Sequence, residues 1–81
     1  MNEQTIRNAI FKTLHGIAPE IDSSELAPDR PLRDQVDLDS MDWLNFIVGL
    51  HETFKIDIPE TDYRKLHTLN DLAGHLRQRT P

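Results

Sequence analysis

The segment from residue 40 to residue 54 most constrains how this chain can fold. On a helical wheel counted from Met41, His51 and the apolar side chains fill an arc of roughly 140–360°. The remaining face holds only small or polar residues: Glu52, Asn45, Gly49, Asp42 and Thr53. So wide an apolar arc must be covered on several sides. We therefore expect a central helix over 40–54 with one narrow polar strip facing water.

Helical spacing also marks both ends of the chain. Apolar residues recur at three- and four-residue intervals over 3–15, where Asn2 is placed to cap the helix and Gly16 to end it. The last helix is expected to begin after Thr68, with Asp71 at the third position of a capping box. Its buried residues are expected to be Leu69, Leu72, Ala73 and Leu76.

The two connections differ in length. Residues 17–38 hold three of the five prolines and regularly spaced apolar side chains, which predicts an ordered loop pinned onto the core. So long a loop is uncommon in a small domain and favours a functional role. Residues 56–59 read as extended, followed by a short helix over 60–66. The predicted fold class is all-α: a small four-helix bundle in a single domain, 1–81, with a long first loop and a short third helix.

Composition excludes several classes of protein. The chain has no cysteine, which rules out a disulfide scaffold, a thiolate zinc site and a cysteine nucleophile. Its longest apolar stretch, 46–50, is far too short to span a bilayer, so no membrane insertion is expected. The N-terminus lacks a signal pattern. We expect a monomer in the cytoplasm.

The negative charge of the chain is concentrated in one segment. Residues 37–62 hold seven acidic residues against Lys55 alone, whereas the rest of the chain is nearly balanced. Nucleic-acid binding needs clustered lysine and arginine, so it is disfavoured. A partner with a basic surface is the natural complement of this segment.

No catalytic or metal-binding constellation is evident. The four histidines, at positions 15, 51, 67 and 75, form no paired ligand motif. The Asp37-x-Asp39 start of a calcium loop is followed by Met41 at a ligand position and Asp42 in place of the turn glycine, which rejects such a loop. Weak divalent-ion binding by these three aspartates stays open. We do not expect an enzyme.

Ser40 stands at the junction of the long loop and the helix over 40–54. Asp39 and Ser40 by themselves indicate no more than a helix cap. However, Asp39-Ser40-Met41 resembles the Asp-Ser-Leu motif that opens the second helix of the acyl carrier protein family. The likeness continues through the ordered segments 50–59 and 66–69 and runs from about Leu32 to Leu76.

The resemblance implies that Ser40, next to Asp39, is the attachment point for a 4′-phosphopantetheine arm. A separate Mg²⁺-dependent phosphopantetheinyl transferase (a holo-carrier synthase) would transfer the arm from coenzyme A. A helix N-terminus suits such a phosphodiester. The arm's thiol would hold acyl groups as thioesters for the acyl-loading, condensing or transfer enzymes of fatty-acid or specialised acyl and polyketide biosynthesis.

The resemblance also implies two sets of binding residues. Basic surfaces of partner enzymes would dock on the acidic residues Asp39, Asp42, Glu52, Glu60 and Asp62. We expect Asp37, Met41 and Trp43, which lie near Ser40, to belong to the same docking surface. An acyl chain would enter a pocket lined by Leu44, Ile47, Ile58, Leu66, Leu72, Ala73 and Leu76. A solvated helix face and plain core packing are the ordinary alternatives for these two sets.

Several residues depart from the family pattern. Asp37 replaces a usual glycine, and Trp43 replaces a small or polar residue. This tryptophan is expected to contact a partner, brace the arm, plug the pocket or pack against the third helix. Gly49 indicates a close neighbour or a bend in its helix. With the longer first loop, these departures favour a specialised carrier. The alternatives are an aminoacyl, aryl or peptidyl carrier, or an unmodified acidic helical adaptor.

Overall fold

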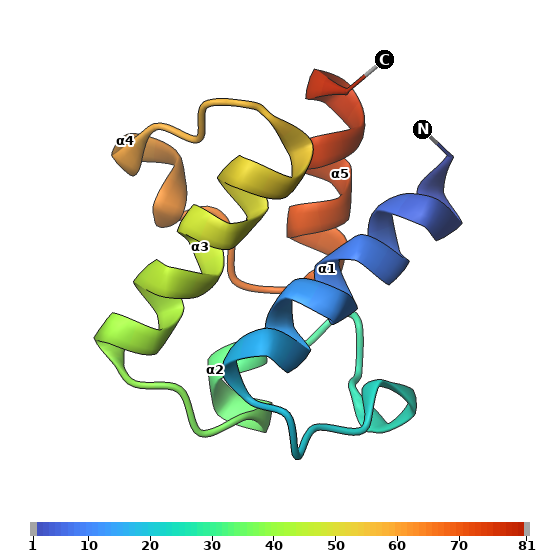
Figure 1. The fold of residues 1–81 in the computed structure, drawn as a ribbon, viewed down its shortest axis with the longest axis vertical. Helices are drawn as coiled ribbons and strands as arrows, with labels where there is room; N and C mark the ends of the chain where they lie inside the picture. The colour runs from blue at the N-terminus through green and yellow to red at the C-terminus, as the bar shows by residue number, and fades with distance from the viewer. Residues whose placement is uncertain (1, 81) are drawn as a thin grey trace.

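Three long helices form the body of the protein, and shorter helical turns lie in the connections between them (Figure 1). The computed structural model describes residues 2–80. In chain order the elements are α1 (Glu3–Ile17), the 3-10 turn η1 (Ser23–Glu25), α2 (Leu32–Gln35), α3 (Ser40–Phe54), α4 (Glu60–Tyr63) and α5 (Leu69–Arg79). This all-helical arrangement confirms the predicted fold class.

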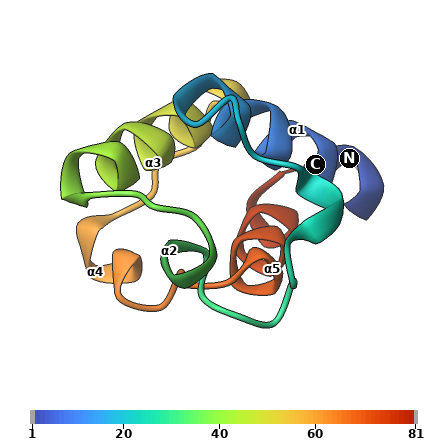
Figure 2. The same cartoon turned by 90° about the horizontal axis from the view of Figure 1, so that it is seen from below.

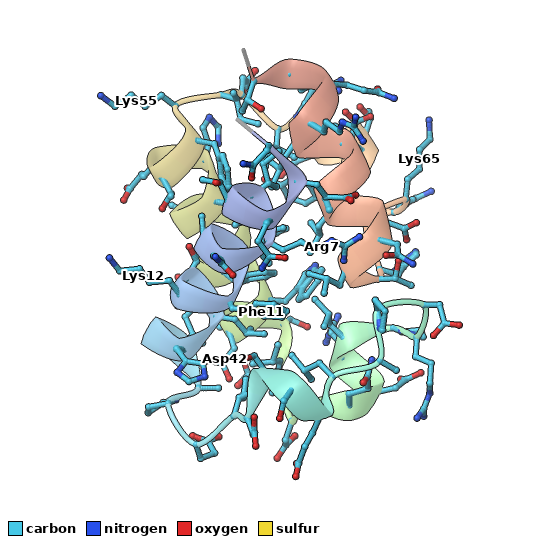
Figure 3. All side chains as sticks on the ribbon, turned by 90° about the vertical axis from the view of Figure 1, so that its right-hand side faces the viewer. Arg7, Phe11, Lys12, Asp42, Lys55 and Lys65 are labelled. Atoms are coloured by element: carbon cyan, nitrogen blue, oxygen red, sulfur yellow. The ribbon has the colours of Figure 1, made fainter. Side chains whose placement is uncertain are left out.

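Helix α1 packs against both α3 and α5, so it is the helix that the other two long helices share (Figure 2). The expectation that the helix over 40–54 lies at the centre was wrong in this respect. One stripe of α1, formed by Ile6, Ile10 and Leu14, is completely buried. On its flank, the Arg7 guanidinium donates a hydrogen bond of 2.9 Å to the Asn70 side chain and ties α1 to α5 (Figure 3).

Helix α1 runs two residues beyond the predicted end. Gly16 lies inside the helix, and the amide of Ala18 still donates to the carbonyl of Leu14 at 2.8 Å. The helix stops there because Pro19 follows, and a proline disfavours helical geometry in the residue before it. Ala18 accordingly has φ −131° and ψ 80°. The proline, rather than the glycine, sets this boundary.

The predicted long loop contains η1 and the single-turn helix α2, which sequence spacing did not reveal. Leu32 at the start of α2 is fully buried, and its amide donates to the carbonyl of His67 at 2.8 Å. The Gln35 side chain bonds the backbone of Ala27 through both its oxygen and its nitrogen. The first contact holds the loop against the segment before α5 and the second ties two parts of the loop together, as the prediction of an ordered, pinned loop requires.

The second half of the chain follows the prediction closely. Residues 56–59 are extended, and α4 begins at Glu60 but ends at Tyr63, three residues before the predicted end. Thr68 caps α5 in a complete capping box with Asp71, as predicted. The core of α5 consists of the four expected residues, Leu69, Leu72, Ala73 and Leu76. Within residues 2–80, no helix is long and apolar enough to cross a membrane.

The buried arc of α3 is narrower than the sequence predicts. Phe46, Ile47, Leu50 and Phe54 are buried, but Met41, Leu44 and Val48 are 64%, 42% and 42% exposed. No other segment of residues 2–80 covers these three side chains. Lys55 ends α3 in the left-handed conformation, with φ 54°.

Candidate functional site

Ser40 occupies the first position of α3, and its side chain is exposed. Asp39 is the N-cap: it has extended geometry, with φ −79° and ψ 179°, and its Oδ1 accepts a hydrogen bond of 2.8 Å from the amide of Asp42. The predicted cap at Asp39 is therefore confirmed. The cap fixes where the helix begins and presents the Ser40 hydroxyl at its end.

The chain that leads into Ser40 is anchored on alternate residues. Val36 and Leu38 are 7% and 6% exposed, whereas Asp37 and Asp39 between and after them face solvent. This period of two is what an extended backbone produces when one side packs on a core. The approach to Ser40 is thus held by two buried side chains rather than free to move as a loop tip.

Two backbone N–H groups remain available beside the Ser40 hydroxyl. The amide of Trp43 bonds the carbonyl of Asp39 at 2.9 Å, and the amide of Asp42 bonds the Asp39 side chain. The amides of Ser40 and Met41 have no partner within residues 2–80. Free N–H groups and the positive end of the helix dipole favour a bound anion here. The arrangement fits a phosphodiester on Ser40.

The predicted docking residues are spread along the segment before α3, α3 itself and α4. Asp37, Asp39, Glu52 and Glu60 are exposed, while Asp42 and Asp62 are half-buried. Asp62 is already engaged, because its carboxylate lies 3.6 Å from the Arg79 guanidinium. Glu52 lies on the α1 side of α3, in the wall of a shallow groove with Lys12 and Thr13.

An exposed apolar stripe accompanies these acids along α3. Met41, Leu44 and Val48 follow one another at three- and four-residue spacing, so they share one face of the helix. Sequence reasoning assigned Met41 to docking, Leu44 to the interior and no role to Val48. The interior assignment of Leu44 is corrected by its exposure. The spacing of these apolar residues is evident in the sequence, but the sequence does not show whether another segment covers their side chains.

Trp43 packs inward beside this stripe. Its ring centroid lies 5.3 Å from that of Phe46, with the planes tilted by 50°, and it contacts the core while remaining only half-buried. This contact lies within α3, so packing of Trp43 against the short third helix expected over 60–66 stays a prediction. A role in contacting a partner or the arm stays a prediction.

The other predicted acyl-pocket residues all lie in the core. Ile47, Ile58, Leu66, Leu72, Ala73 and Leu76 are at most 3% exposed. Three cavities open at the surface of residues 2–80, and none of them has these six residues in its wall. An acyl chain would therefore need these side chains to move apart.

The histidines and aspartates do not assemble into a metal site. Across the described part of the chain, no three His, Asp or Glu side chains are grouped to hold a metal ion. Asp37, Asp39 and Asp42 do not converge as the weak-binding interpretation requires. His75 is distinctive for another reason: its Nε2 is buried with no hydrogen-bond partner among residues 2–80. Burial lowers the pKa of His75, and Arg79 lowers it further, against the opposing effect of Asp62.

Comparison with known proteins agrees with this geometry. The family described as "Phosphopantetheine attachment site" matches residues 9–76. An acyl carrier protein of Desulforapulum autotrophicum is 28% identical over 78 residues, covering 96% of both chains. One from Helicobacter hepaticus is 27% identical over 69 residues, covering 82% of this chain and 91% of that protein.

A solved structure shows the same fold. The solution structure of a protein assigned as an acyl carrier protein in Anaplasma phagocytophilum superposes with a TM-score of 0.86. It covers 100% of this chain and 94% of its own, at 23% identity. The chain belongs to the phosphopantetheine attachment family. Within that family it falls with the acyl carrier proteins, which bear a covalent 4′-phosphopantetheine and serve other enzymes as carriers.

Proposed function

We propose that residues 1–81 form one carrier domain and that Ser40 is the residue to which the 4′-phosphopantetheine is attached. The observation that carries this proposal is the exposed Ser40 hydroxyl at the first position of α3, beside the free amides of Ser40 and Met41. Ser23 and Ser24, the other serines of the chain, lie in η1, where Ser24 is bound to Asp22. A three-residue turn offers no comparable helix end.

The chain's own residues hold and present the attached group. The helix end stabilises the phosphodiester charge, and Val36 and Leu38 fix the approach to Ser40. The attached arm supplies a thiol, on which acyl groups are carried as thioesters. Phosphopantetheinyl transferase and acyl-loading, condensing or transfer enzymes are the proposed partners. Asp37 and Trp43 support a carrier dedicated to one specialised pathway.

Partner enzymes are proposed to dock on α3 through both charge and apolar contact. Asp37, Asp39, Asp42, Glu52, Glu60 and Asp62 supply the negative surface, with Met41 and the half-buried Trp43 beside it. Each exposed ion pair contributes only about 0.2–1 kcal/mol and is screened by salt. The apolar stripe adds contact that salt does not weaken. Weak and rapidly reversible docking suits a carrier that visits several enzymes.

Intact mass measures the attachment directly. The protein is incubated with coenzyme A, Mg²⁺ and a broad-specificity phosphopantetheinyl transferase, alongside Ser40→Ala and the matched control Ser24→Ala. We expect one phosphopantetheine on the wild type and on Ser24→Ala, and none on Ser40→Ala. Circular dichroism confirms that each variant is folded.

Two results would overturn the proposal. Modification of Ser40→Ala would move the attachment point elsewhere. No modification of folded wild-type protein by this transferase and by a second one of different specificity would leave the unmodified adaptor as the better function. The adaptor is favoured by one observation of its own, the exposed stripe of Met41, Leu44 and Val48. Its partner binding would be unaffected by Ser40→Ala.

A further inference from the structure

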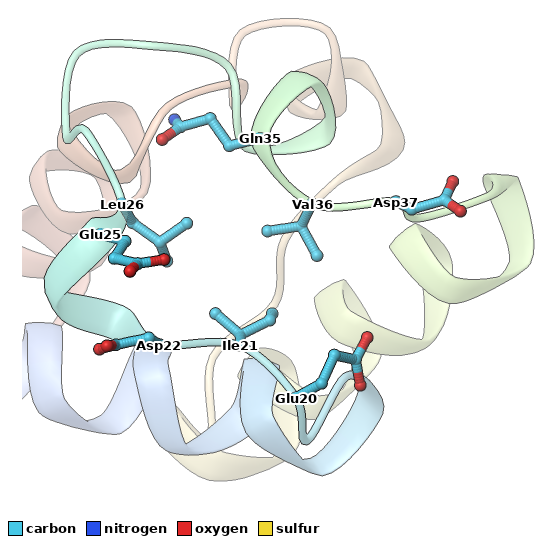
Figure 4. Close-up of a pocket in the computed structure, with 8 residues that line it drawn as sticks. All are labelled: Glu20, Ile21, Asp22, Glu25, Leu26, Gln35, Val36 and Asp37. Atoms are coloured by element: carbon cyan, nitrogen blue, oxygen red, sulfur yellow. The ribbon is translucent and has the colours of Figure 1, made fainter.

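A cavity of about 300 Å³ lies between the segment that follows α1 and the segment that joins α2 to α3 (Figure 4). Its wall brings together two stretches of the long first loop. Glu20, Ile21, Asp22, Glu25 and Leu26 come from one side, and Gln35, Val36 and Asp37 from the other. At this volume it is among the smallest cavities that bind ligands, and it suits a single side chain.

The wall of this loop pocket combines an apolar surface with negative charge. Ile21, Leu26 and Val36 pack against the core and offer their remaining surface to the cavity. Four acidic residues belong to the lining, although the carboxylates of Asp22 and Asp37 point away from the cavity centre (Figure 4), and no lysine or arginine is among the lining residues. The only uncharged polar side chain, Gln35, is already bonded to the backbone of Ala27.

Three of the four carboxylates are available to a partner. Asp22 is engaged, because its Oδ1 accepts hydrogen bonds from the hydroxyl and the amide of Ser24, which lower the pKa of Asp22. Glu20, Glu25 and Asp37 are exposed, and their carboxylates make no hydrogen bond or ion pair within residues 2–80. The pocket therefore presents unpaired negative charge above an apolar wall.

The chemistry complementary to such a wall is that of an arginine side chain. Its methylene stem covers apolar surface while its guanidinium stays at the rim. The planar guanidinium binds carboxylates through several N–H groups at once, which an ammonium cannot match. Charge complementarity thus selects a basic residue of a partner protein, rather than an anionic or purely apolar ligand.

The position of the pocket indicates which partner protein supplies the arginine side chain. Asp37 is three residues before Ser40, so their Cα atoms are at most about 11 Å apart. The enzyme that modifies Ser40 must bring the Ser40 oxygen itself into its active site, and its surface then lies within reach of the pocket.

We propose that the loop pocket is a second docking site, which receives an arginine side chain of the phosphopantetheinyl transferase while α3 contacts the same enzyme. This inference rests on the proposed modification of Ser40. It assigns a role to the long first loop, and it extends the docking surface beyond α3 and α4.

Steady-state kinetics of the transferase test the charge at the pocket. The pocket variant Glu20→Gln/Glu25→Gln is compared with the control Glu3→Gln/Asp29→Asn, which removes the same charge from exposed positions outside the pocket wall. We expect the pocket variant to raise KM for the carrier about threefold to tenfold with kcat unchanged, since each exposed ion pair is worth less than about fivefold. The control should change KM less than twofold, and added salt should shrink the difference.

Methyl NMR tests whether the pocket itself is occupied. Ser40→Ala carrier with labelled methyl groups is titrated with the transferase and coenzyme A. We expect shifts at the methyls of Ile21, Leu26 and Val36 together with those of α3. Chemical-shift changes confined to α3, or equal KM values for the pocket variant and its control, would overturn this inference. Modification of the wild type in the same experiments would still support Ser40 as the attachment residue. Absence of any modification would instead remove the proposed function.

Discussion

Asp39 combines two properties that substitution can separate: its side chain caps α3, and its charge lies beside Ser40. Its Oδ1 accepts from the amide of Asp42 at 2.8 Å. Because alanine cannot accept this bond, Asp39→Ala should lower the free energy of unfolding by about 1 kcal/mol. Asparagine caps as well as aspartate, so Asp39→Asn should retain most of the stability. Urea unfolding of the two variants measures the difference.

The asparagine variant also isolates the charge. If Asp39 takes part in docking, Asp39→Asn should be modified more slowly than the wild type at low salt despite its near-normal stability. Equal destabilisation by alanine and asparagine would contradict the capping account. Equal modification rates for the asparagine variant and the wild type would confine Asp39 to its role in the helix.

His75 should make stability depend on pH. Its pKa is lowered from the ordinary value of 6.5, first because burial disfavours the imidazolium and then because of Arg79, with Asp62 acting in the opposite direction. The unfolded chain therefore binds a proton more readily than the folded one. The stability contributed by neutral His75 is fully present above pH 6.5. It falls as the pH drops through 6.5 towards the lower folded pKa.

Urea unfolding between pH 5 and 8, for the wild type and His75→Gln, checks this expectation. The difference in free energy of unfolding, wild type minus variant, should decrease as the pH falls, since the carboxylates contribute to both proteins alike. A ring-proton titration of His75 by NMR gives its folded pKa independently. If the difference in free energy of unfolding stays constant from pH 5 to 8, protonating His75 costs no more in the folded protein than in the unfolded chain.

Two helices approach closely at Gly49. A Cβ built on Gly49 of α3 would lie 2.7 Å from Cγ2 of Thr13 on α1. The Thr13 hydroxyl donates to the Ala9 carbonyl at 2.9 Å, which hinders its side chain from turning away. Alanine would gain about 0.5–1 kcal/mol from helix propensity but lose about 1–3 kcal/mol from overpacking. Gly49→Ala should therefore lower the free energy of unfolding by about 1 kcal/mol.

Thr13→Ser is the matched control for this crossing. Serine keeps the hydroxyl that bonds Ala9 but lacks the methyl group that meets the new Cβ. The double variant Thr13→Ser/Gly49→Ala should therefore recover the stability lost by Gly49→Ala, measured by thermal or urea unfolding. A double variant no more stable than the single one would show that the cost of alanine does not come from Thr13.

The elements that sequence predicted well are those defined by their own residues. The caps at Asn2, Asp39 and Thr68 are local hydrogen-bonding patterns, and each appears where expected. Helix α2 was not predicted because one turn is too short to show periodicity, and its stability comes from Leu32 in a distant core contact. The glycine at position 49 of α3 indicated that another residue lies close to it, but only the fold identifies that residue as Thr13 of α1.

The candidate site divides in the same way. Ser40 and Asp39 were found from a contiguous motif that fixes its own geometry. The exposure of Leu44 depends on which segments pack against α3, and the loop pocket depends on how residues 20–26 meet 35–37. Local residue spacing predicts neither the exposure of Leu44 nor the loop pocket, because both arise when segments distant in the sequence pack together.

At the scale of the whole molecule, the packing of the core determines whether an acyl group can be held inside the bundle. Ile47 and Leu72 are completely buried, and they line none of the three surface cavities described above. If the cargo enters the core, the folded state gains buried methylene groups, each worth about 0.8 kcal/mol, against the cost of moving these side chains. A substitution that leaves a cavity in the core should therefore increase the free energy of unfolding gained when the acyl group is loaded.

Unfolding of holo and octanoyl-loaded protein tests this coupling. Leu72→Ala should destabilise the holo form by about 2–5 kcal/mol, and loading should return part of that loss, because the octanoyl chain fills the space left behind. Ile47→Val offers a milder change if the alanine variant does not fold. Leu44→Ala is the matched control: Leu44 is 42% exposed, so its truncation should leave the gain on loading equal to that of the wild type. A gain on loading that is the same for Leu72→Ala, Ile47→Val and Leu44→Ala would show that the acyl chain does not enter the core around Ile47 and Leu72.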